Sequence, residues 1–223
     1  MPMNRLQLVL PFLSTLVFLA CMDEQRRSDD TITTENAALW TDETATYLPV
    51  TAEWTNRVEV ADLNGDRKVD LLFANGGNYS EAGDPEYSRV FLNQGPDQKF
   101  KEITAEVFGE SRYLSRVIKV SDVNKDGIPD IIVGTTYQTQ SQLYLGNGTG
   151  KFENLTVSHF PAVKASVGDI ELGDVDDDGD LVMILSDWGP GSNMNNSGGR
   201  TMLWVNDGQG VCSDVTATQR PGL

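Results

Sequence analysis

Three short acidic segments carry the side chains best suited to chemistry. Each has oxygen-bearing side chains at its first, third and fifth positions, a tight turn at the sixth and, in two segments, a carboxylate at the ninth. Such side chains, with a backbone carbonyl at the seventh position, are the hard oxygen ligands that Ca²⁺ prefers, whereas Mg²⁺ needs stricter octahedral geometry. The predicted calcium ligands are Asp62, Asn64, Asp66, Lys68 and Asp70; Asp122, Asn124, Asp126, Ile128 and Asp130; and Asp174, Asp176, Asp178 and Asp180.

The second half of each segment excludes an EF-hand. An EF-hand needs Glu at position 12 and helices on both sides, whereas position 12 here is Phe73, Val133 or Leu185 and the flanks alternate as strands do. A plainer interpretation is that Asp, Asn and Gly only form turns. Three copies in the same register favour metal binding over turns alone.

Strands are expected to hold these segments in place. Each segment follows a stretch in which apolar and polar residues alternate, which is typical of a half-buried strand. Two further apolar triplets follow each segment, so the acidic residues should lie in loops at strand ends. The apolar stretches are 58–62, 71–73 and 90–92; 118–122, 131–133 and 143–145; and 170–174, 183–185 and 203–205.

An internal repeat sets the architecture. The five-residue segments that start at Trp40, Phe100, Phe152 and Cys212 align without gaps and end in Thr, which gives repeat lengths of 60, 52 and 60 residues. The acidic segments begin 18 residues after each of the first three Thr. A β-sandwich with chance similarity would not produce this constant offset, whereas about four strands per repeat is typical of a propeller blade.

We therefore expect an all-β chain of propeller blades, each with about four antiparallel strands. The repeat region is 37–223, with three complete repeats at about 40–99, 100–151 and 152–211 and the start of a fourth at 212–223. A closed propeller needs about four to eight blades. The chain is expected to be part of a longer reading frame, as its end inside a repeat favours, or to close a partial propeller by self-association.

The amino-acid composition argues against several classes of function. The 223 residues carry 17 Lys and Arg against 33 Asp and Glu, a net charge of -16. Nucleic acids are bound by basic patches, so this balance argues against a nucleic-acid partner. The single His159, two Cys residues and the lack of a nucleophile motif argue against histidine catalysis and a four-Cys zinc site. We expect no catalytic residues and no enzyme activity.

The N-terminus is typical of an export signal. Residues 1–5 carry one positive charge, and the apolar run that follows is too short for a comfortable membrane span. The run ends in Leu-Ala before Cys21. This ending resembles the lipobox of bacterial lipoproteins, in which the Cys is lipidated and becomes the mature N-terminus. Ordinary secretion with a chance Cys is the alternative.

The expected location follows from this resemblance. Residues 1–20 would be a signal peptide, and residues 21–36, which are too polar to fold, a lipidated N-terminus and tether. The chain would cross the inner membrane and stay lipid-anchored in the cell envelope, at the outer membrane or the cell surface. If Cys21 is lipidated, Cys212 has no partner within the chain and should be a free, buried thiol.

The motifs resemble those of a known family. The D-x-[DN]-x-D-G-x-x-D loops, with the recurrent F-x-[DEN]-[VIL]-T and L-[FYW]-[LV]-N-x-G motifs, are similar to the FG-GAP/VCBS repeats of integrin α-like β-propellers and of secreted bacterial proteins of the ASPIC/UnbV type. The resemblance covers about residues 40–220. It implies Ca²⁺ in the blade loops and a role in adhesion or recognition. It implies no particular ligand, because fold and function are separable.

Departures from the family pattern rank the three loops. Arg67 replaces the turn Gly of the first loop, which costs on the order of 1 kcal/mol if that position is left-handed. Val182 replaces the ninth-position carboxylate of the third loop, and Asp180 offers only its backbone carbonyl. The second loop is therefore expected to bind calcium best, followed by the first and then the third.

The expected function is that of an extracytoplasmic calcium-binding repeat protein. It would act as a non-enzymatic adhesion or recognition module for a protein or glycan ligand at the cell surface, with membrane contact only through its N-terminal lipid. The alternative is an accessory or partial domain of a secreted hydrolase or lyase. Segments 76–88 and 187–200, with Tyr79, Tyr87 and Trp188, are candidate recognition elements or plain insertions.

Overall fold

A computed structural model describes residues 41–175, 177–192 and 195–218. The signal, lipid and tether segments predicted at 1–36 lie outside the described residues, as do Cys21, Trp40 and Asp176. The chain divides into two compact units, Met1–Asp42 and Glu43–Leu223, and the features below belong to the second. In the described part of the chain, no helix has the length and apolar character that crossing a bilayer requires.

Three antiparallel sheets of four strands each confirm the all-β blade prediction. In each sheet the strands pair in chain order, as in a propeller blade. The strands are β1 (Thr55–Ala61), β2 (Asp70–Asn75), β3 (Arg89–Leu92) and β4 (Lys101–Glu102); β5 (Ser115–Ser121), β6 (Asp130–Thr135), β8 (Gln142–Gly146) and β9 (Phe152–Asn154); and β11 (Val167–Gly173), β12 (Val182–Asp187), β15 (Met202–Asn206) and β16 (Cys212–Asp214).

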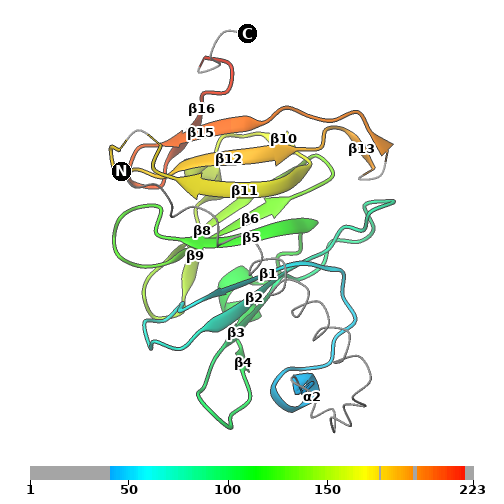
Figure 1. The fold of residues 1–223 in the computed structure, drawn as a ribbon, viewed down its shortest axis with the longest axis vertical. Helices are drawn as coiled ribbons and strands as arrows, with labels where there is room; N and C mark the ends of the chain where they lie inside the picture. The colour runs from blue at the N-terminus through cyan, green and yellow to red at the C-terminus, as the bar shows by residue number, and fades with distance from the viewer. Residues whose placement is uncertain (1–40, 176, 193–194, 219–223) are drawn as a thin grey trace, which may run out of the picture. The chain divides into compact units, whose positions relative to one another are not determined.

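Short elements complete the described fold. Three helices of one turn are α2 (Thr44–Tyr47), α3 (Thr104–Phe108) and α4 (Thr156–His159). Two small ladders pair β7 (Thr139–Gln140) with β10 (Lys164–Ala165), and β13 (Gly191–Ser192) with β14 (Asn195–Asn196). None of these elements interrupts the order of the three sheets (Figure 1).

The sheets are out of phase with the repeat counted in the sequence. The segment that opens each counted repeat forms the outer strand of the preceding sheet, as β4, β9 and β16 show. Residues 212–214 therefore complete the third sheet and do not begin a fourth. Hydrogen bonds fix this phase, because the recurrent Thr accepts one from a backbone N–H of the third strand. These pairs are Thr104 with Val90 (3.1 Å), Thr156 with Leu143 (2.9 Å) and Thr216 with Leu203 (2.9 Å).

The middle sheet is buried on both faces. Strand β5 contacts both β1 and β11, so the first strands of the three sheets are neighbours. Ile131 and Val133 of β6 belong to the core shared with the first sheet, and Ile132 to the core shared with the third. Successive side chains of a strand point to opposite faces, so one strand serves two cores.

The two outer sheets expose equivalent positions. Ile118 of β5 is fully buried, whereas Val58, 60 residues earlier in β1, is 49% exposed. Ile132 is also fully buried, whereas Ile184, 52 residues later in β12, is 42% exposed. Each outer sheet therefore has one face with exposed apolar side chains. In the middle sheet, both faces are covered by a neighbouring sheet.

Candidate metal loops

The predicted loops lie at one end of the sheets. Residues 62–69, 122–129 and 174–181 connect the first strand of each sheet to the second. Figure 1 shows β11 running towards this end and β12 running back from it. The sequence repeat thus brings the three acidic segments to the same side of neighbouring blades.

The Asp at position 1 folds each loop back on itself. One carboxylate oxygen accepts a hydrogen bond from the backbone N–H of position 6, which closes a tight turn. Backbone amides stabilise the ionised carboxylate in this arrangement. The bonds join Asp62 to Arg67 (2.7 Å), Asp122 to Gly127 (2.8 Å) and Asp174 to Gly179 (2.9 Å).

Position 6 is left-handed in all three loops. Its φ is 65° at Arg67, 80° at Gly127 and 85° at Gly179. The sequence-based concern about Arg67 is therefore confirmed, since a residue with a Cβ pays about 1–2 kcal/mol in this conformation. The first loop keeps the shape of the second despite this cost.

Positions 3 and 5 add further turn hydrogen bonds. Their side-chain oxygens accept a hydrogen bond from the backbone N–H two residues later. Each of these oxygens is therefore held close to the loop backbone. Asn64 accepts from Asp66 (3.0 Å) and Asn124 from Asp126 (3.1 Å). Asp66 accepts from Lys68 (2.9 Å), Asp126 from Ile128 (2.8 Å) and Asp178 from Asp180 (2.7 Å).

The Asp at position 9 is fully buried and ties three chain segments together. In the second loop, Asp130 accepts hydrogen bonds from the backbone N–H groups of Val123 and Gly146, both at 2.9 Å. Asp70 makes the same pair of bonds with Leu63 and Asn93, both at 2.8 Å. Each carboxylate therefore joins its own loop to the end of the third strand.

Burial changes the proton affinity of these two groups. It raises the pKa of Asp130 to about 6, although the two backbone hydrogen bonds oppose the shift and the charges of Asp126 and Asp122 add to it. Burial raises the pKa of Asp70 as well. The third loop has no such group, since Val182 takes the position and packs as a buried apolar residue.

Lysine ammonium groups already lie on two of the loops. Lys68 Nζ is 2.8 Å from Asp66 Oδ2 within the first loop. Lys125 of the second loop forms an ion pair with Asp180 of the third. The carboxylates of the first and third loops therefore each pair with a lysine ammonium group. The lysine that pairs with the third loop comes from the neighbouring second blade.

The donor chemistry fits calcium. Each loop offers carboxylate and backbone carbonyl oxygens, and the first two add the amide oxygens of Asn64 and Asn124; these are the ligands of a hard cation. Among the residues that the structure describes, however, no three acidic, His or Cys side chains converge as metal ligands would. The loop carboxylates bond instead to backbone N–H groups, and Asp176 lies outside the described residues. Calcium binding stays a prediction for all three loops.

Comparison with known proteins gives the family. The profile of the FG-GAP-like repeat matches residues 62–133 and 122–185, which together cover more than half of the chain. This chain belongs to the FG-GAP-like repeat family. Chicken (Gallus gallus) integrin alpha-6 is 31% identical over 94 residues, 41% of this chain. The match spans 9% of the integrin, so it relates the repeats and not the whole proteins.

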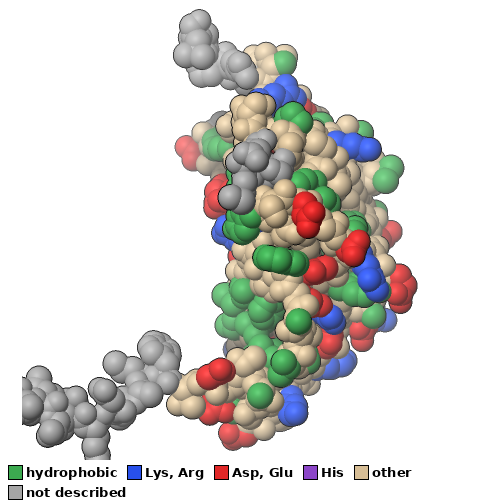
Figure 2. Space-filling model, turned by 90° about the vertical axis from the view of Figure 1, so that its right-hand side faces the viewer, with side chains coloured by type: hydrophobic (Ala, Val, Ile, Leu, Met, Phe, Trp, Pro, Cys, Tyr) green, Lys and Arg blue, Asp and Glu red, His purple; other side chains and the backbone are tan. Residues whose placement is uncertain are grey.

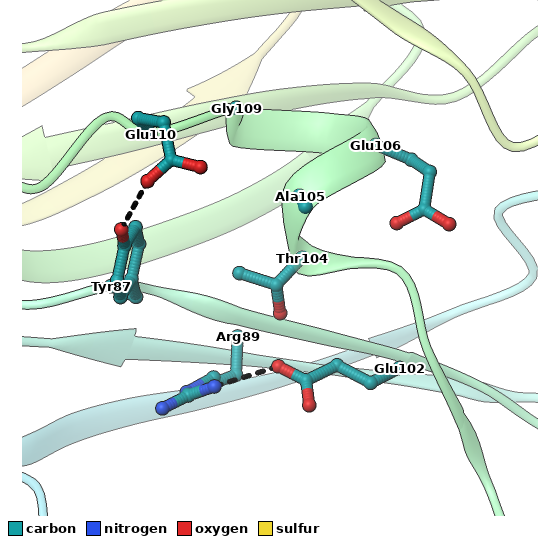
Figure 3. A pocket seen from close by; sticks show the side chains of 8 residues that line it. All are labelled: Tyr87, Arg89, Glu102, Thr104, Ala105, Glu106, Gly109 and Glu110. Atoms are coloured by element: carbon teal, nitrogen blue, oxygen red, sulfur yellow. Dashed lines mark hydrogen bonds and ion pairs between the residues drawn. The ribbon is translucent and has the colours of Figure 1, made fainter.

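A polar pocket lies on the outer side of the first FG-GAP-like blade. It has a volume of about 270 Å³ and is lined by residues of β3, β4 and α3 together with Tyr87, Gly109 and Glu110, which lie next to these elements (Figure 3). Its carboxylates include Glu102, which pairs with Arg89 (2.7 Å), and Glu110, which accepts from the hydroxyl of Tyr87 (2.8 Å). These two glutamates are engaged by partners within the protein.

The opposite end of the blades carries the long segments 76–88 and 187–200. Figure 2 looks onto this end and shows hydrophobic side chains gathered near its middle, with acidic and basic side chains around them. Tyr79 and Trp188, from the segments interpreted as candidate recognition elements or plain insertions, both contact the guanidinium of Arg116. Sequence reasoning missed Arg116, although it stands 60 residues after Asn56 and so in register with the repeat.

Proposed function

We propose that this FG-GAP-like repeat protein is a calcium-binding recognition module without catalytic activity. The observation that carries the proposal is the repetition of one acidic loop, in one conformation, at the same end of three neighbouring blades. The carboxylates at positions 1 and 5 of every copy accept turn hydrogen bonds, and the recurrence of this acidic pattern in three loops at one end of the blades supports a shared cation-binding role.

The residues that would hold calcium follow from the loop positions. In the second loop they are Asp122, Asn124, Asp126, Asp130 and the carbonyl of Ile128, and the first loop offers the equivalent set. Bound Ca²⁺ would supply the positive charge that offsets repulsion among the loop carboxylates. The calcium-bound loops would then stiffen the connection between the first and second strands of each blade.

The ligand is proposed to be a protein or glycan at the cell surface. The relation to an integrin supports adhesion or protein recognition, and the long segments at the end opposite the loops supply the candidate surface. Lipidation of Cys21 would tether this surface to the cell envelope. The exposed apolar faces of the outer sheets would take further blades of the propeller or a second copy of the chain.

Calcium binding by the mature chain is the first test. Equilibrium dialysis against ⁴⁵Ca²⁺, with and without excess Mg²⁺, should give at least two ions per chain and little competition by Mg²⁺. Asp126→Ala should remove one ion, because it deletes the fifth-position ligand of the second loop. Binding of no calcium by a chain that unfolds cooperatively would reduce the loops to turns and overturn this function.

A further inference from the structure

The three first strands share a β-bulge at the end opposite the acidic loops. The pairing register shifts between Thr55 and Arg57 in β1, between Ser115 and Val117 in β5, and between Val167 and Asp169 in β11. The extra residues are Asn56, Arg116 and Gly168, which occupy one position of the repeat. A bulge redirects the side chain of its extra residue. Three neighbouring blades thus contribute these three residues to one place.

Arg116 is the centre of this cluster. Its side chain is 5% exposed, and its Nη1 donates a 2.7 Å hydrogen bond to Oδ1 of Asn56. The guanidinium carbon lies 4.7 Å from the ring centre of Tyr79 and 5.1 Å from that of Trp188. Cation–π contact with two rings holds the planar group in a fixed orientation.

The third bulge residue makes room for one of these rings. A Cβ at Gly168 would lie 2.1 Å from Nε1 of Trp188, so only glycine allows the indole to lie where it does. Asn56 is fixed in turn, because its Nδ2 donates to the carbonyls of Gly76 (2.7 Å) and Ser115 (2.8 Å). The surroundings of Arg116 are therefore built by side chains that have partners of their own.

Two donors of Arg116 remain without a partner. Its Nε and Nη2 are buried and have no hydrogen-bond partner of normal geometry; burial lowers the pKa of the guanidinium, and interaction with the Tyr79 side chain only opposes this shift. None of the ion pairs among the described residues involves Arg116. Buried polar groups are rarely left in this state, because each costs about 1–3 kcal/mol. Nε and Nη2 form one edge of the guanidinium, and this edge can hold both oxygens of a carboxylate in parallel hydrogen bonds.

We propose that this edge of Arg116 binds a carboxylate of a protein partner, either an Asp or Glu side chain or a chain end. The proposal rests on the proposed recognition function and names the chemistry of its ligand. Trp, Tyr and Arg are the residues that dominate protein–protein hot spots, and all three meet here. The net charge of -16 repels polyanions, so a single carboxylate suits the site better than a phosphate polymer.

Tyr79 is the more exposed of the two rings that contact Arg116. It lies on the segment between β2 and β3, and its side chain is 54% exposed, so solvent and not the core surrounds most of the ring. Rotation of an exposed side chain takes picoseconds to nanoseconds. Entry of a ligand carboxylate requires the buried edge to be uncovered, and rotation of the exposed Tyr79 ring would allow this.

The test is an NMR titration of the full mature chain in calcium, read on the arginine Nε–H signals. The probes are N-acetyl-aspartate amide and its neutral match, N-acetyl-asparagine amide. We expect the Arg116 signal, identified by its loss in Arg116→Met, to shift saturably with the aspartate probe and not with the asparagine probe. Equal shifts with both probes, or no shift with either, would overturn the proposal.

Variants separate this role from a structural one. Arg116→Lys keeps the charge but loses the two-donor edge, so binding of the aspartate probe should weaken by at least about tenfold. The matched control is Arg57→Met, because Arg57 lies next to a bulge but pairs with Asp169 at 3.0 Å. This control should bind as the parent chain does, and unchanged binding by Arg116→Lys would overturn the proposal.

Two further outcomes are informative. The first identifies the class of anion that binds Arg116, and the second separates the carboxylate site from the proposed calcium-binding function. Tighter binding of inorganic phosphate or glucuronate than of the aspartate probe would overturn the assignment to a protein carboxylate. If calcium still binds the chain while the aspartate probe leaves Arg116 unchanged, the carboxylate site fails and the calcium-binding module stands.

Discussion

The carboxylate of Asp130 accepts a 2.9 Å hydrogen bond from the backbone N–H of Val123, seven residues earlier in the chain. Val123 lies inside the second acidic loop, and Asp130 is the first residue of β6. The buried carboxylate therefore holds the last residue of the loop region to the loop itself.

Asp130→Ala should destabilise the chain even without metal. The substitution leaves two buried N–H groups without acceptors, which costs about 2–5 kcal/mol of unfolding free energy. Asp126→Ala removes an exposed carboxylate of the same loop and should cost less than about 1 kcal/mol in EDTA. Urea unfolding in EDTA compares the two variants, and equal costs would contradict the closing role of Asp130.

Stability of the metal-free chain should fall between pH 5 and pH 7. Asp130 has a pKa of about 6 in the fold against 3.8 as the ordinary value, so the folded chain holds a proton there that the unfolded chain has released. This contribution is full below pH 4 and is lost as pH rises through 6. Urea unfolding of a chelator-washed sample at several pH values measures it.

The matched variant for this pH dependence is Asp130→Asn, which cannot titrate. Its stability should change less between pH 5 and pH 7 than that of the parent chain. A parent chain that becomes more stable as pH rises over this range would show that the Asp130 carboxyl is not protonated in the metal-free fold.

Calcium should raise the melting temperature in proportion to the number of working loops. A ligand that binds only the folded chain adds about 2.7 kcal/mol at a concentration of 100 Kd. Asp126→Ala should reduce the rise more than Asp178→Ala, because the third loop lacks the carboxylate at Val182. Thermal unfolding in EDTA and in a calcium series measures the rise, and a larger effect of Asp178→Ala would reverse the ranking.

Lys125→Gln should strengthen calcium binding by the third loop. The ammonium of Lys125 pairs with Asp180, so its removal frees negative charge for a cation, and affinity at low salt should rise by about three- to tenfold. Lys119→Gln is the control, since Lys119 pairs with Glu171 in a neighbouring strand. Calorimetric titration should show no gain for the control, and a gain of equal size would mean that only net charge matters.

Equivalent positions of the outer and middle sheets should differ sharply in how well they tolerate a lysine substitution. In the single chain, with no further blade or second copy on these faces, Val58→Lys and Ile184→Lys place charge on exposed positions and should change the unfolding free energy by less than about 0.5 kcal/mol. Ile118→Lys and Ile132→Lys place it in the two cores and should prevent folding, because a buried unpaired charge is strongly unfavourable. Circular dichroism distinguishes the pairs, and a comparable loss at Val58 would mean that another chain covers that face.

The sequence indicates the sheets well because two simple signals agree. Alternation places β1, β5 and β11, and the recurrent Thr104, Thr156 and Thr216 mark the outer strands that they fasten. The sequence does not show to which sheet the outer strand belongs, because the repeat has the same period in either phase. Only the hydrogen bonds of β16 to β15 settle that the third sheet is complete.

The candidate sites were predicted unevenly. The cost assigned to Arg67 depended on a left-handed conformation at position 6, and the structure shows this conformation. The closing role of Asp130 was not expected, because hydrogen bonds to backbone N–H groups leave no trace in residue type. Arg116 was missed for a related reason, as a β-bulge adds one residue to a strand without changing its alternation enough to be recognised.

The middle blade also determines how cooperatively the described blades unfold. Strand β6 supplies Ile131 and Val133 to one core and Ile132 to the other, so neither core can open while the other keeps its full set of contacts. Repeat arrays unfold piecemeal only when the interfaces between neighbours are weak relative to each repeat. Here a single strand is common to both interfaces, and the described blades should therefore melt in one transition, with loosening confined to the outer strands β4 and β16.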